Sequence, residues 1–499
     1  MTLLALMHTL IALCLAVYGL NSFILTFLYL RHRRATIPTP PLDRSALPTV
    51  TVQVPVYNER HVVERVIDAV AALDYPRQRL QIQILDDSTD DTTRLARAQA
   101  ALHRERGIDI AVLRRPKRDG FKAGALAWGL SQARGEYVAI FDADFCPRPD
   151  FLLQTIPHFL ARPRLGMAQT RWSYLNGDYS PLTRAQTLAL DGHFVVEQNG
   201  RNRAGLLMSF NGTGGVWRRR CIEEAGGWTA DTLCEDLDLS YRAQLAGWES
   251  LYLPKVDAPA EVPPQIAAFK RQQSRWAQGS VQTLRKLAGP ILRHRRLGWG
   301  QKAMALVHLS SYLAHPLMVL LLLASLPLLL TPDATPLSVS GLGLICLGPP
   351  LVYAVSQWEL YPDWGRRLRA LPLLILMGIG IAWANTRAVW RGLTRWGGAF
   401  ARTPKFRLEG RDGRWADSDY RLQADGNIIG EIALMIYALV TAFVAYITGN
   451  RGMIPFLLLY AAAFGTVAGM GLAQTLAPRR RRPLRSPPAK LKTLDADQR

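Results

Sequence analysis

Apolar residues are concentrated towards the two ends of the chain, and charged residues occupy its middle. A run at 3–30 holds few polar side chains and is followed by basic residues at 31–34. Further apolar runs come after the middle region, at about 303–330, 338–359, 370–390, 429–448 and 452–474. About 20 apolar residues are enough for a helix to cross a bilayer. The pattern therefore predicts a polar domain inserted between transmembrane helices.

The basic flanks of the apolar runs predict how the chain is oriented. We expect 1–34 to be a retained transmembrane helix with its basic end in the cytoplasm, and the Arg-rich stretch 475–499 to be a disordered cytoplasmic tail. An even number of crossings must then follow the middle domain. Because 370–390 is basic on both flanks, we expect 370–428 to contain an interfacial or re-entrant helix, with a sixth crossing as the alternative. Two transmembrane helices each are expected in 303–359 and 429–474.

Strand and helix patterns alternate in the first part of the middle region. Apolar runs at 50–54, 81–85 and 137–141 predict strands, and helical patterns lie at 60–73, 91–104 and 121–133. The alternation predicts an α/β domain whose parallel sheet is covered by helices on both faces. Ligands of such sheets bind at the carboxyl ends of the strands.

Acidic side chains follow each of these predicted strands. The three strands lead into Tyr57 and Glu59, into Asp86 and Asp87, and into Asp142 and Asp144, respectively. Converging carboxylates repel one another unless a cation or a hydrogen-bonding ligand lies among them. An Asp-x-Asp pair can hold Mg²⁺ or Mn²⁺ while substrate phosphates complete the octahedron. The strand ends therefore predict a site for a divalent cation and a phosphorylated ligand.

Basic and aromatic motifs add to this site. Lys122 begins a helical pattern between the second and third strand ends, a position that favours phosphate. The stretch 276–300 has apolar residues at helical spacing among Arg and Lys, which predicts an amphipathic interfacial helix. Pro290 interrupts this pattern, so we expect the helix to be kinked or in two pieces.

Composition narrows the class of protein further. The formal net charge is +21, but the basic residues lie beside apolar runs, so we expect a membrane surface and not nucleic acid as the partner. The five cysteines are scattered and form no C-x-x-C pair. Neither a disulfide framework nor a structural zinc site is expected.

The order of the polar motifs resembles one known family. Asp86-Asp87, Asp142-x-Asp144, Glu235-Asp236 and Gln272-x-x-Arg275-Trp276 resemble the D, D, D, Q-x-x-R-W series of processive family 2 glycosyltransferases. This group contains cellulose, chitin and hyaluronan synthases. Over about 48–290 the chain looks closest to plant cellulose-synthase-like mannan synthases. The stretch 400–405 resembles the F-x-V-T-x-K gating loop of cellulose synthases, with Arg402 in place of the Val.

The resemblance implies a fold and an activity. The fold is a cytoplasmic GT-A domain at 48–275, a Rossmann-like mixed α/β sheet inserted between the transmembrane helices of a multi-pass plasma or inner membrane protein. The activity is inverting transfer of a hexose from UDP-glucose or GDP-mannose to a β-linked polysaccharide, made processively and exported across the membrane. The partners implied are a nucleotide sugar donor, a glycan or lipid acceptor and the bilayer.

The resemblance also implies a role for each motif residue. Asp236 would be the general base, with Glu235 beside it. The remaining roles are nucleotide-sugar binding by Tyr57, Glu59, Asp87, Lys122, Asp142 and Arg275, binding of Mg²⁺ or Mn²⁺ by Asp142 and Asp144, acceptor binding by Gln272 and Trp276, and gating by Phe400, Thr403 and Lys405.

Two alternatives use the same sequence features. A single transfer to diacylglycerol or ceramide would need the same catalytic residues and would make a glycolipid. A membrane channel or binding protein with a degenerate transferase domain would have lost an acidic motif, and all of them are present here.

Overall fold

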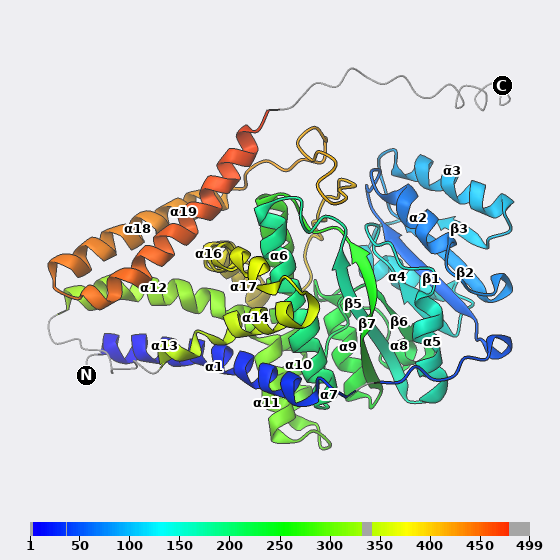
Figure 1. Cartoon of the computed structure of the whole chain (residues 1–499), viewed down its shortest axis with the longest axis horizontal. Helices are drawn as coiled ribbons and strands as arrows, with labels where there is room; N and C mark the ends of the chain where they lie inside the picture. The colour runs from blue at the N-terminus through cyan, green and yellow to red at the C-terminus, as the bar shows by residue number, and fades with distance from the viewer. Residues whose placement is uncertain (1–2, 36, 332–341, 479–499) are drawn as a thin grey trace.

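The computed structural model describes residues 3–35, 37–331 and 342–478. An α/β domain lies at one end of the molecule, and long helices extend from it to the other end (Figure 1). The expected tail from 479 onward and the first residues of the apolar run 338–359 lie outside the described residues.

A seven-stranded mixed sheet forms the centre of the α/β domain, in the order β3-β2-β1-β4-β6-β5-β7. Its strands are β1 (Val50–Val56), β2 (Leu80–Asp86), β3 (Ile110–Leu113), β4 (Tyr137–Ile140), β5 (Leu165–Tyr174), β6 (Gly215–Arg218) and β7 (Glu249–Ala260). Neighbouring strands are parallel except at β6, which is antiparallel to both β4 and β5. The three strands predicted from the sequence are present and parallel to one another. The sheet as a whole is not parallel as the alternation predicted, because β6 is antiparallel, and the mixed sheet implied by the resemblance is confirmed.

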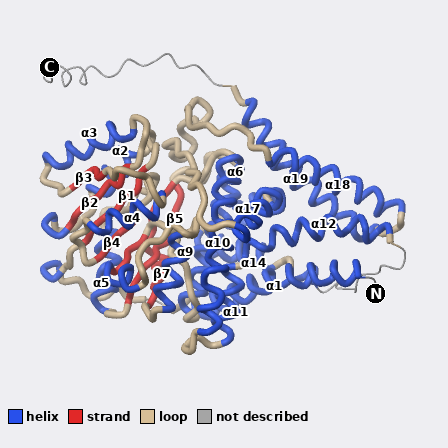
Figure 2. The backbone as a smooth tube through the Cα atoms, turned by 180° about the vertical axis from the view of Figure 1, so that it is seen from behind, coloured by secondary structure: helices blue, strands red, loops and turns tan. Residues whose placement is uncertain are grey.

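Helices cover both faces of this sheet, as Figure 2 shows from behind. In β1, Val50, Val52 and Val54 are buried, which is typical of a strand covered on both sides. The covering helices include α2 (Val63–Ala71), α3 (Thr92–Glu105), α4 (Phe121–Ser131), α5 (Phe151–Ala161), α8 (Arg219–Glu224) and α9 (Glu235–Leu245). Because β1, β2 and β4 are parallel neighbours, their carboxyl ends meet at one edge of the sheet.

A continuous helical stretch stands between the sheet and the membrane helices (Figure 1). It consists of α6 (Pro181–Asp191), the π-helix η3 (Gly192–Gln198) and α7 (Asn199–Arg203). The Ser180 side chain caps α6 and Pro181 occupies its first turn, a combination that favours a helix start. A π-helix seven residues long is rare, and such segments are frequent at functional sites.

Four described helices are long and apolar enough to cross a membrane. They are α1 (Leu3–His32), the stretch Ser311–Leu330 that contains α12 (Ala314–Leu330), α18 (Asn427–Ile447) and α19 (Ile454–Leu476). α1 packs against α12, and α18 packs against α19. Outward-facing side chains such as Leu20, Phe27 and Phe443 are exposed, as expected of surfaces that face lipid. These helices indicate an integral membrane protein.

The apolar run 338–359 differs from a single continuous span. Its described part forms α13 (Leu342–Ile345) and α14 (Gly348–Leu360), which are 4 and 13 residues long. The break between them comes directly before Gly348-Pro349-Pro350. Proline has no N–H to continue the hydrogen bonds of a preceding helix, which explains why α13 ends there.

The run 370–390 forms two helices that meet at an angle. The stretch Trp364–Gly380, which contains α15 (Trp364–Arg367) and α16 (Leu371–Gly380), is bent by 44° from α17 (Ala382–Thr394). A bent pair of this kind suits a re-entrant segment or a broken span. The interfacial segment therefore stays a prediction.

The helix α10 (Ile266–Arg293) connects the α/β domain to the membrane helices, and α11 (Trp299–Leu309) follows it. Of the two forms expected for this segment, kinked or in two pieces, the second is not found, because one helix continues through Pro290. Only three residues of the helix follow the proline, so Pro290 disturbs its last turn alone. Near its start, the buried Lys270 Nζ lies 2.9 Å from Glu431 Oε1 on α18 and 2.9 Å from Asp425 Oδ1. Three charges therefore tie α10 to the α18–α19 pair.

Candidate active site

A cleft opens at the carboxyl ends of β1, β2 and β4. Its other walls come from the start of α9, from α10 and from the segment 400–405, which lies between α17 and α18 in the chain. With its open mouth, the cleft encloses about 1280 Å³ of empty space. Every side chain to which the resemblance gives a role lines this cleft: Tyr57, Glu59, Asp87, Lys122, Asp142, Asp144, Glu235, Asp236, Gln272, Arg275, Trp276, Phe400, Thr403 and Lys405. Asp86, also expected at these strand ends, does not line it, because its side chain is buried and bonds to Arg114 and Thr93.

Two lysines neutralise the Asp-x-Asp pair that follows β4. Lys122 Nζ lies 2.6 Å from Asp142 Oδ1, and Lys405 Nζ lies 2.7 Å from Asp144 Oδ2. Asp144 Oδ2 also accepts the backbone N–H of Glu261 at 3.1 Å. Among the described residues, no group of three or more His, Cys, Asp or Glu side chains is arranged to hold a metal. Two carboxylates supply only part of an octahedron, which is how Mg²⁺ is held when substrate phosphates complete it.

Aromatic and basic side chains form the end of the cleft at β1 and β2. The Arg118 guanidinium carbon lies 3.4 Å from the centre of the Tyr57 ring and 4.9 Å from that of Phe121. Both carboxylate oxygens of Asp87 accept hydrogen bonds from Arg115, at 2.9 and 2.7 Å. This end offers a flat aromatic surface next to fixed charges, which suits a planar base.

Glu235 and Asp236 occupy the first turn of α9, where the helix dipole favours negative charge. Burial raises the pKa of both carboxyl groups, and the charge of Asp236 raises that of Glu235 further, whereas Lys122 opposes both shifts. Gly212, at φ +80°, passes so close that an added Cβ would lie 2.9 Å from Asp236 Oδ2. Asp236 is therefore a carboxylate with a raised pKa, and it lies beside the backbone of a glycine, which has no side chain to shield it.

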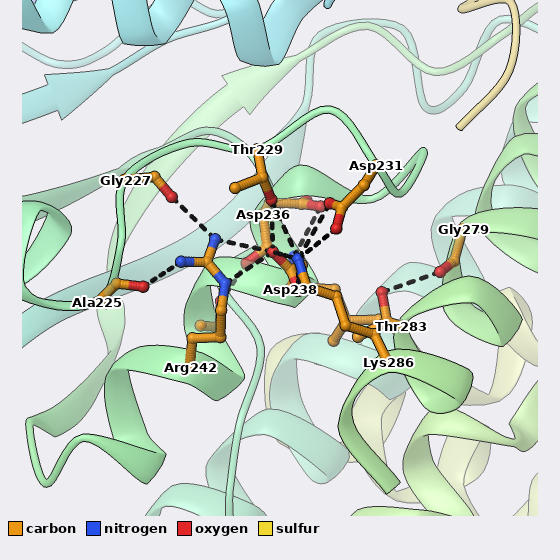
Figure 3. Close-up of polar contacts among 12 residues, drawn as sticks. Ala225, Gly227, Thr229, Asp231, Asp236, Asp238, Arg242, Gly279, Thr283 and Lys286 are labelled. Carbon is orange, nitrogen blue, oxygen red and sulfur yellow. Dashed lines mark hydrogen bonds and ion pairs between the residues drawn. The ribbon is translucent and has the colours of Figure 1, made fainter. Parts of the chain in front are cut away.

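A second set of charges holds the helix that carries this acidic pair (Figure 3). The Asp238 carboxylate is buried, and it lies 2.8 Å from Arg242 Nη2 and 3.0 Å from Lys286 Nζ. Lys286 belongs to α10 and also pairs with Asp231 at 2.8 Å. The acidic turn of α9 and the helix with the Q-x-x-R-W residues are thereby held as one unit.

The segment 400–405 lies in the cleft and not beside it. The Phe400 ring stacks on Phe121 at 6.4 Å, and the Arg275 guanidinium carbon lies 4.3 Å from its centre. Arg402 Nη1 is 3.3 Å from Glu59 Oε2. Burial raises the pKa of Glu59 to about 8, although the nearby Arg402 charge opposes the shift. Arg402, the position at which the segment departs from the gating-loop pattern, thus faces an acidic residue of the cleft.

Sequence reasoning missed several polar residues of the cleft. Arg118 belongs to a basic stretch, 114–118, that precedes Lys122, and this charge cluster was an available signal. Glu261 follows β7 as the other acidic residues follow their strands, and its carbonyl accepts a hydrogen bond from Lys405 at 2.9 Å. Asn211 lies in a glycine-rich turn before β6, where the sequence gives no indication of its partners.

A mixed α/β sheet with carboxylates at its strand ends, an acidic helix start across the cleft and a frame of membrane helices define a glycosyltransferase of the GT-A type. Residues 48–279 match the family model described as glycosyltransferase like family 2. Probable glucomannan 4-beta-mannosyltransferase 2 of Oryza sativa subsp. japonica is 33% identical over 460 residues, which cover 89% of this chain and 77% of that protein. The chain belongs to glycosyltransferase family 2, and its resemblance to the plant mannan synthases is confirmed.

Two further relatives are more similar over a shorter region. Glucomannan 4-beta-mannosyltransferase 1 of Oryza sativa subsp. japonica is 42% identical over 54% of this chain, and glucomannan 4-beta-mannosyltransferase 2 of Arabidopsis thaliana is 42% identical over 52%. The matched region spans about half the length of each, 52% and 50%. Among solved structures, the mannosyltransferase PcManGT from Pyrobaculum calidifontis in complex with GDP-Man and Mn2+ has a TM-score of 0.52, with 23% identity. That comparison covers 77% of this chain and 99% of the other, and it supports the fold.

Proposed function

We propose that the protein is an inverting membrane glycosyltransferase that transfers a hexose from a nucleotide sugar to a growing β-linked polysaccharide. The observation that carries the proposal is the single cleft, in which the Asp142–Asp144 pair, Lys122 and Asp236 lie together with Arg275 and Trp276. The names of the relatives favour a mannosyl donor, GDP-mannose, over UDP-glucose. The catalytic domain faces the cytoplasm in this proposal, where nucleotide sugars are made.

The donor diphosphate would lie against the Asp-x-Asp pair. The oxygen-only donor set of Asp142 and Asp144 fits a hard divalent cation, Mg²⁺ or Mn²⁺. When bound, this ion supplies positive charge beside the leaving diphosphate. Lys122 and Arg275 add fixed positive charges on the same side, and the base would lie at the end of the cleft that Tyr57 and Arg118 line.

The acceptor would approach from the side of α9 and α10. Asp236 takes the proton from the acceptor hydroxyl, and its raised pKa suits it to this task near neutral pH. Attack from the face opposite the leaving diphosphate inverts the anomeric centre, so an α-linked donor gives a β-linked product. Trp276 would stack against the face of the acceptor sugar, and Gln272 would hydrogen-bond to it.

The segment 400–405 would act as a gate over the donor. Two contacts support this role: Lys405 bonds to Asp144, and Phe400 packs on Phe121. The side chain of Thr403 is buried. Because the segment joins α17 to α18, its opening would be linked to the membrane helices, beside which the growing chain would be exported.

Product partitioning tests this proposal. The full chain in lipid nanodiscs with Mg²⁺ or Mn²⁺ would receive radiolabelled GDP-mannose and UDP-glucose separately. We expect counts in an ethanol precipitate that β-mannanase or another β-glycanase releases, and the active donor names the sugar. Counts that move to the organic phase and need added diacylglycerol or ceramide would make the protein a glycolipid synthase instead.

Replacing Trp276 by Ala is expected to shorten the product or stop its elongation. The lost stacking surface weakens acceptor binding about tenfold, whereas the donor KM changes by less than about threefold. Product length by size-exclusion chromatography and donor KM measured by nucleotide release check this. Trp276→Phe keeps an aromatic face and is the matched control. Product of unchanged length from the Ala variant would argue against an acceptor role.

A further inference from the structure

A chain of side-chain hydrogen bonds runs from the π-helix η3 to the cleft. His193 Nδ1 lies 3.0 Å from Glu197 Oε2, and His193 Nε2 lies 2.9 Å from Asn211 Nδ2. Asn211 Oδ1 accepts a hydrogen bond of 2.6 Å from Gln198 Nε2. Of these four hydrogen-bonded residues, Asn211 is the one that lines the cleft. The other three belong to a stretch of seven residues, Gly192–Gln198, with π-helical hydrogen bonding.

The partners of Gln198 determine which group donates and which accepts in each of these hydrogen bonds. Its Nε2 also donates to the carbonyl of Ser209 at 2.7 Å, so the atom facing Asn211 is a donor. Asn211 must then present its oxygen to Gln198 and its NH₂ group to His193. His193 Nε2 accepts this hydrogen bond, and the ring proton on Nδ1 is donated to the Glu197 carboxylate. The network thus assigns one amide orientation and one histidine tautomer.

The backbone at Asn211 is fixed as firmly as its side chain. Its N–H donates to Oε1 of the buried Gln169 at 2.8 Å, and Gln169 Nε2 donates to the carbonyls of Thr213 and Gly214. The following residue, Gly212, is the one that approaches Asp236 Oδ2. Asn211 therefore lines the same cleft as the carboxylate that would act as general base, one residue before the backbone that approaches it.

We propose that His193 and Glu197 are positioning residues that aim the Asn211 amide at the acceptor sugar. Of the two N–H groups on Asn211 Nδ2, one bonds to His193, and the second donates to an acceptor oxygen beside Asp236. An amide already locked in its working orientation loses little freedom when the acceptor binds, so binding energy is not spent on ordering it. The inference rests on the proposed function, since it deepens the acceptor half of the same site.

The test measures acceptor and donor KM separately on the full chain in nanodiscs. GDP-mannose with mannotetraose is the pair of probes, or UDP-glucose with cellotetraose if glucose is transferred. His193→Phe is expected to raise the acceptor KM about tenfold, equivalent to about 1.4 kcal/mol, and to change the donor KM less than twofold. His193→Gln places an amide oxygen near the Nε2 position and is expected to recover most of the loss. His103→Gln removes a similar pair on the outer helices, where His103 lies 2.7 Å from Asp68, and is the matched control.

A double-mutant cycle separates positioning from a general structural effect. Asn211→Ala is expected to raise the acceptor KM as His193→Phe does, and the double variant is expected to be no worse than Asn211→Ala. The cycle also serves if His193→Phe folds poorly, with His193→Leu in its place. Additive losses, an unchanged acceptor KM, or equal losses of donor and acceptor binding would overturn the inference while wild-type transfer persists. A wild-type protein that transfers neither sugar would instead refute the proposed function.

Discussion

Replacing Asp236 by Asn is expected to lower hexose transfer by about 10²–10⁴-fold while nucleotide binding stays within about twofold of wild type. The amide keeps the size of the carboxylate but cannot take a proton from the acceptor hydroxyl. Glu235 lies beside it, yet its nearest cation is Lys122, with Nζ 3.9 Å from Oε1, on the donor side of the cleft. Transfer measured with radiolabelled donor, and nucleotide binding measured by calorimetry, separate the two effects.

The dependence of the transfer rate on pH is a second test of Asp236 as the general base. A general base works only when deprotonated, and burial raises the pKa of Asp236. Wild-type transfer should therefore decline with falling pH at a higher pH than an ordinary Asp would give. Asp74→Asn, at an exposed ion pair with Arg44, is the control for a changed surface charge. Turnover close to wild type in Asp236→Asn would remove Asp236 as the base.

Replacing Asp144 by Asn is expected to reduce both transfer and acceptor-independent donor hydrolysis by about 100-fold or more. One of the two carboxylates proposed for the divalent cation is lost, and each factor of ten corresponds to about 1.4 kcal/mol of barrier. Nucleotide binding should also lose its dependence on Mn²⁺, which calorimetric titrations with and without EDTA would measure.

Asp144 also pairs with Lys405, so its replacement affects the gate as well as the donor site. Lys405→Met removes the ion pair and keeps both carboxylates, and it is the matched comparison. We expect this variant to retain the Mn²⁺ dependence that Asp144→Asn loses. Identical behaviour of the two variants would show that the lost ion pair with Lys405, and not a lost metal ligand, explains the lower activity of Asp144→Asn.

The local pattern of the sequence predicted the strand ends well because each acidic residue directly follows an apolar run. Asp142 follows Phe141, which is buried, and Asp87 follows β2 in the same way. The partners of these side chains came from elsewhere. Arg115 holds both oxygens of Asp87, and Arg118 covers Tyr57, yet both lie in a loop for which spacing predicts no direction.

Helix patterns assume a period of 3.6 residues, and this limited what they predicted. The π-helical turn at Gly192–Gln198 has a different period, so no pattern singled out His193 or Glu197. Pro290 interrupts the apolar pattern, but the sequence does not show that it lies in the last turn of α10. Which apolar runs span the bilayer depends on bends, as between α16 and α17, that are set by packing against neighbours.

The two ion pairs of Lys270, with Glu431 and with Asp425, determine where this protein can be truncated. A soluble fragment that ended after α10 would keep the lysine and discard both acids, leaving an unpaired cation at a newly exposed, largely apolar surface. Water would hydrate the exposed lysine, but both ion pairs and the packing of α10 against the helices that follow it would be lost. The α/β domain is therefore packed and paired with the C-terminal helices as part of one structure. For recombinant work, the unit to express extends through α19, so that α10 keeps both acids and the helices that pack against it.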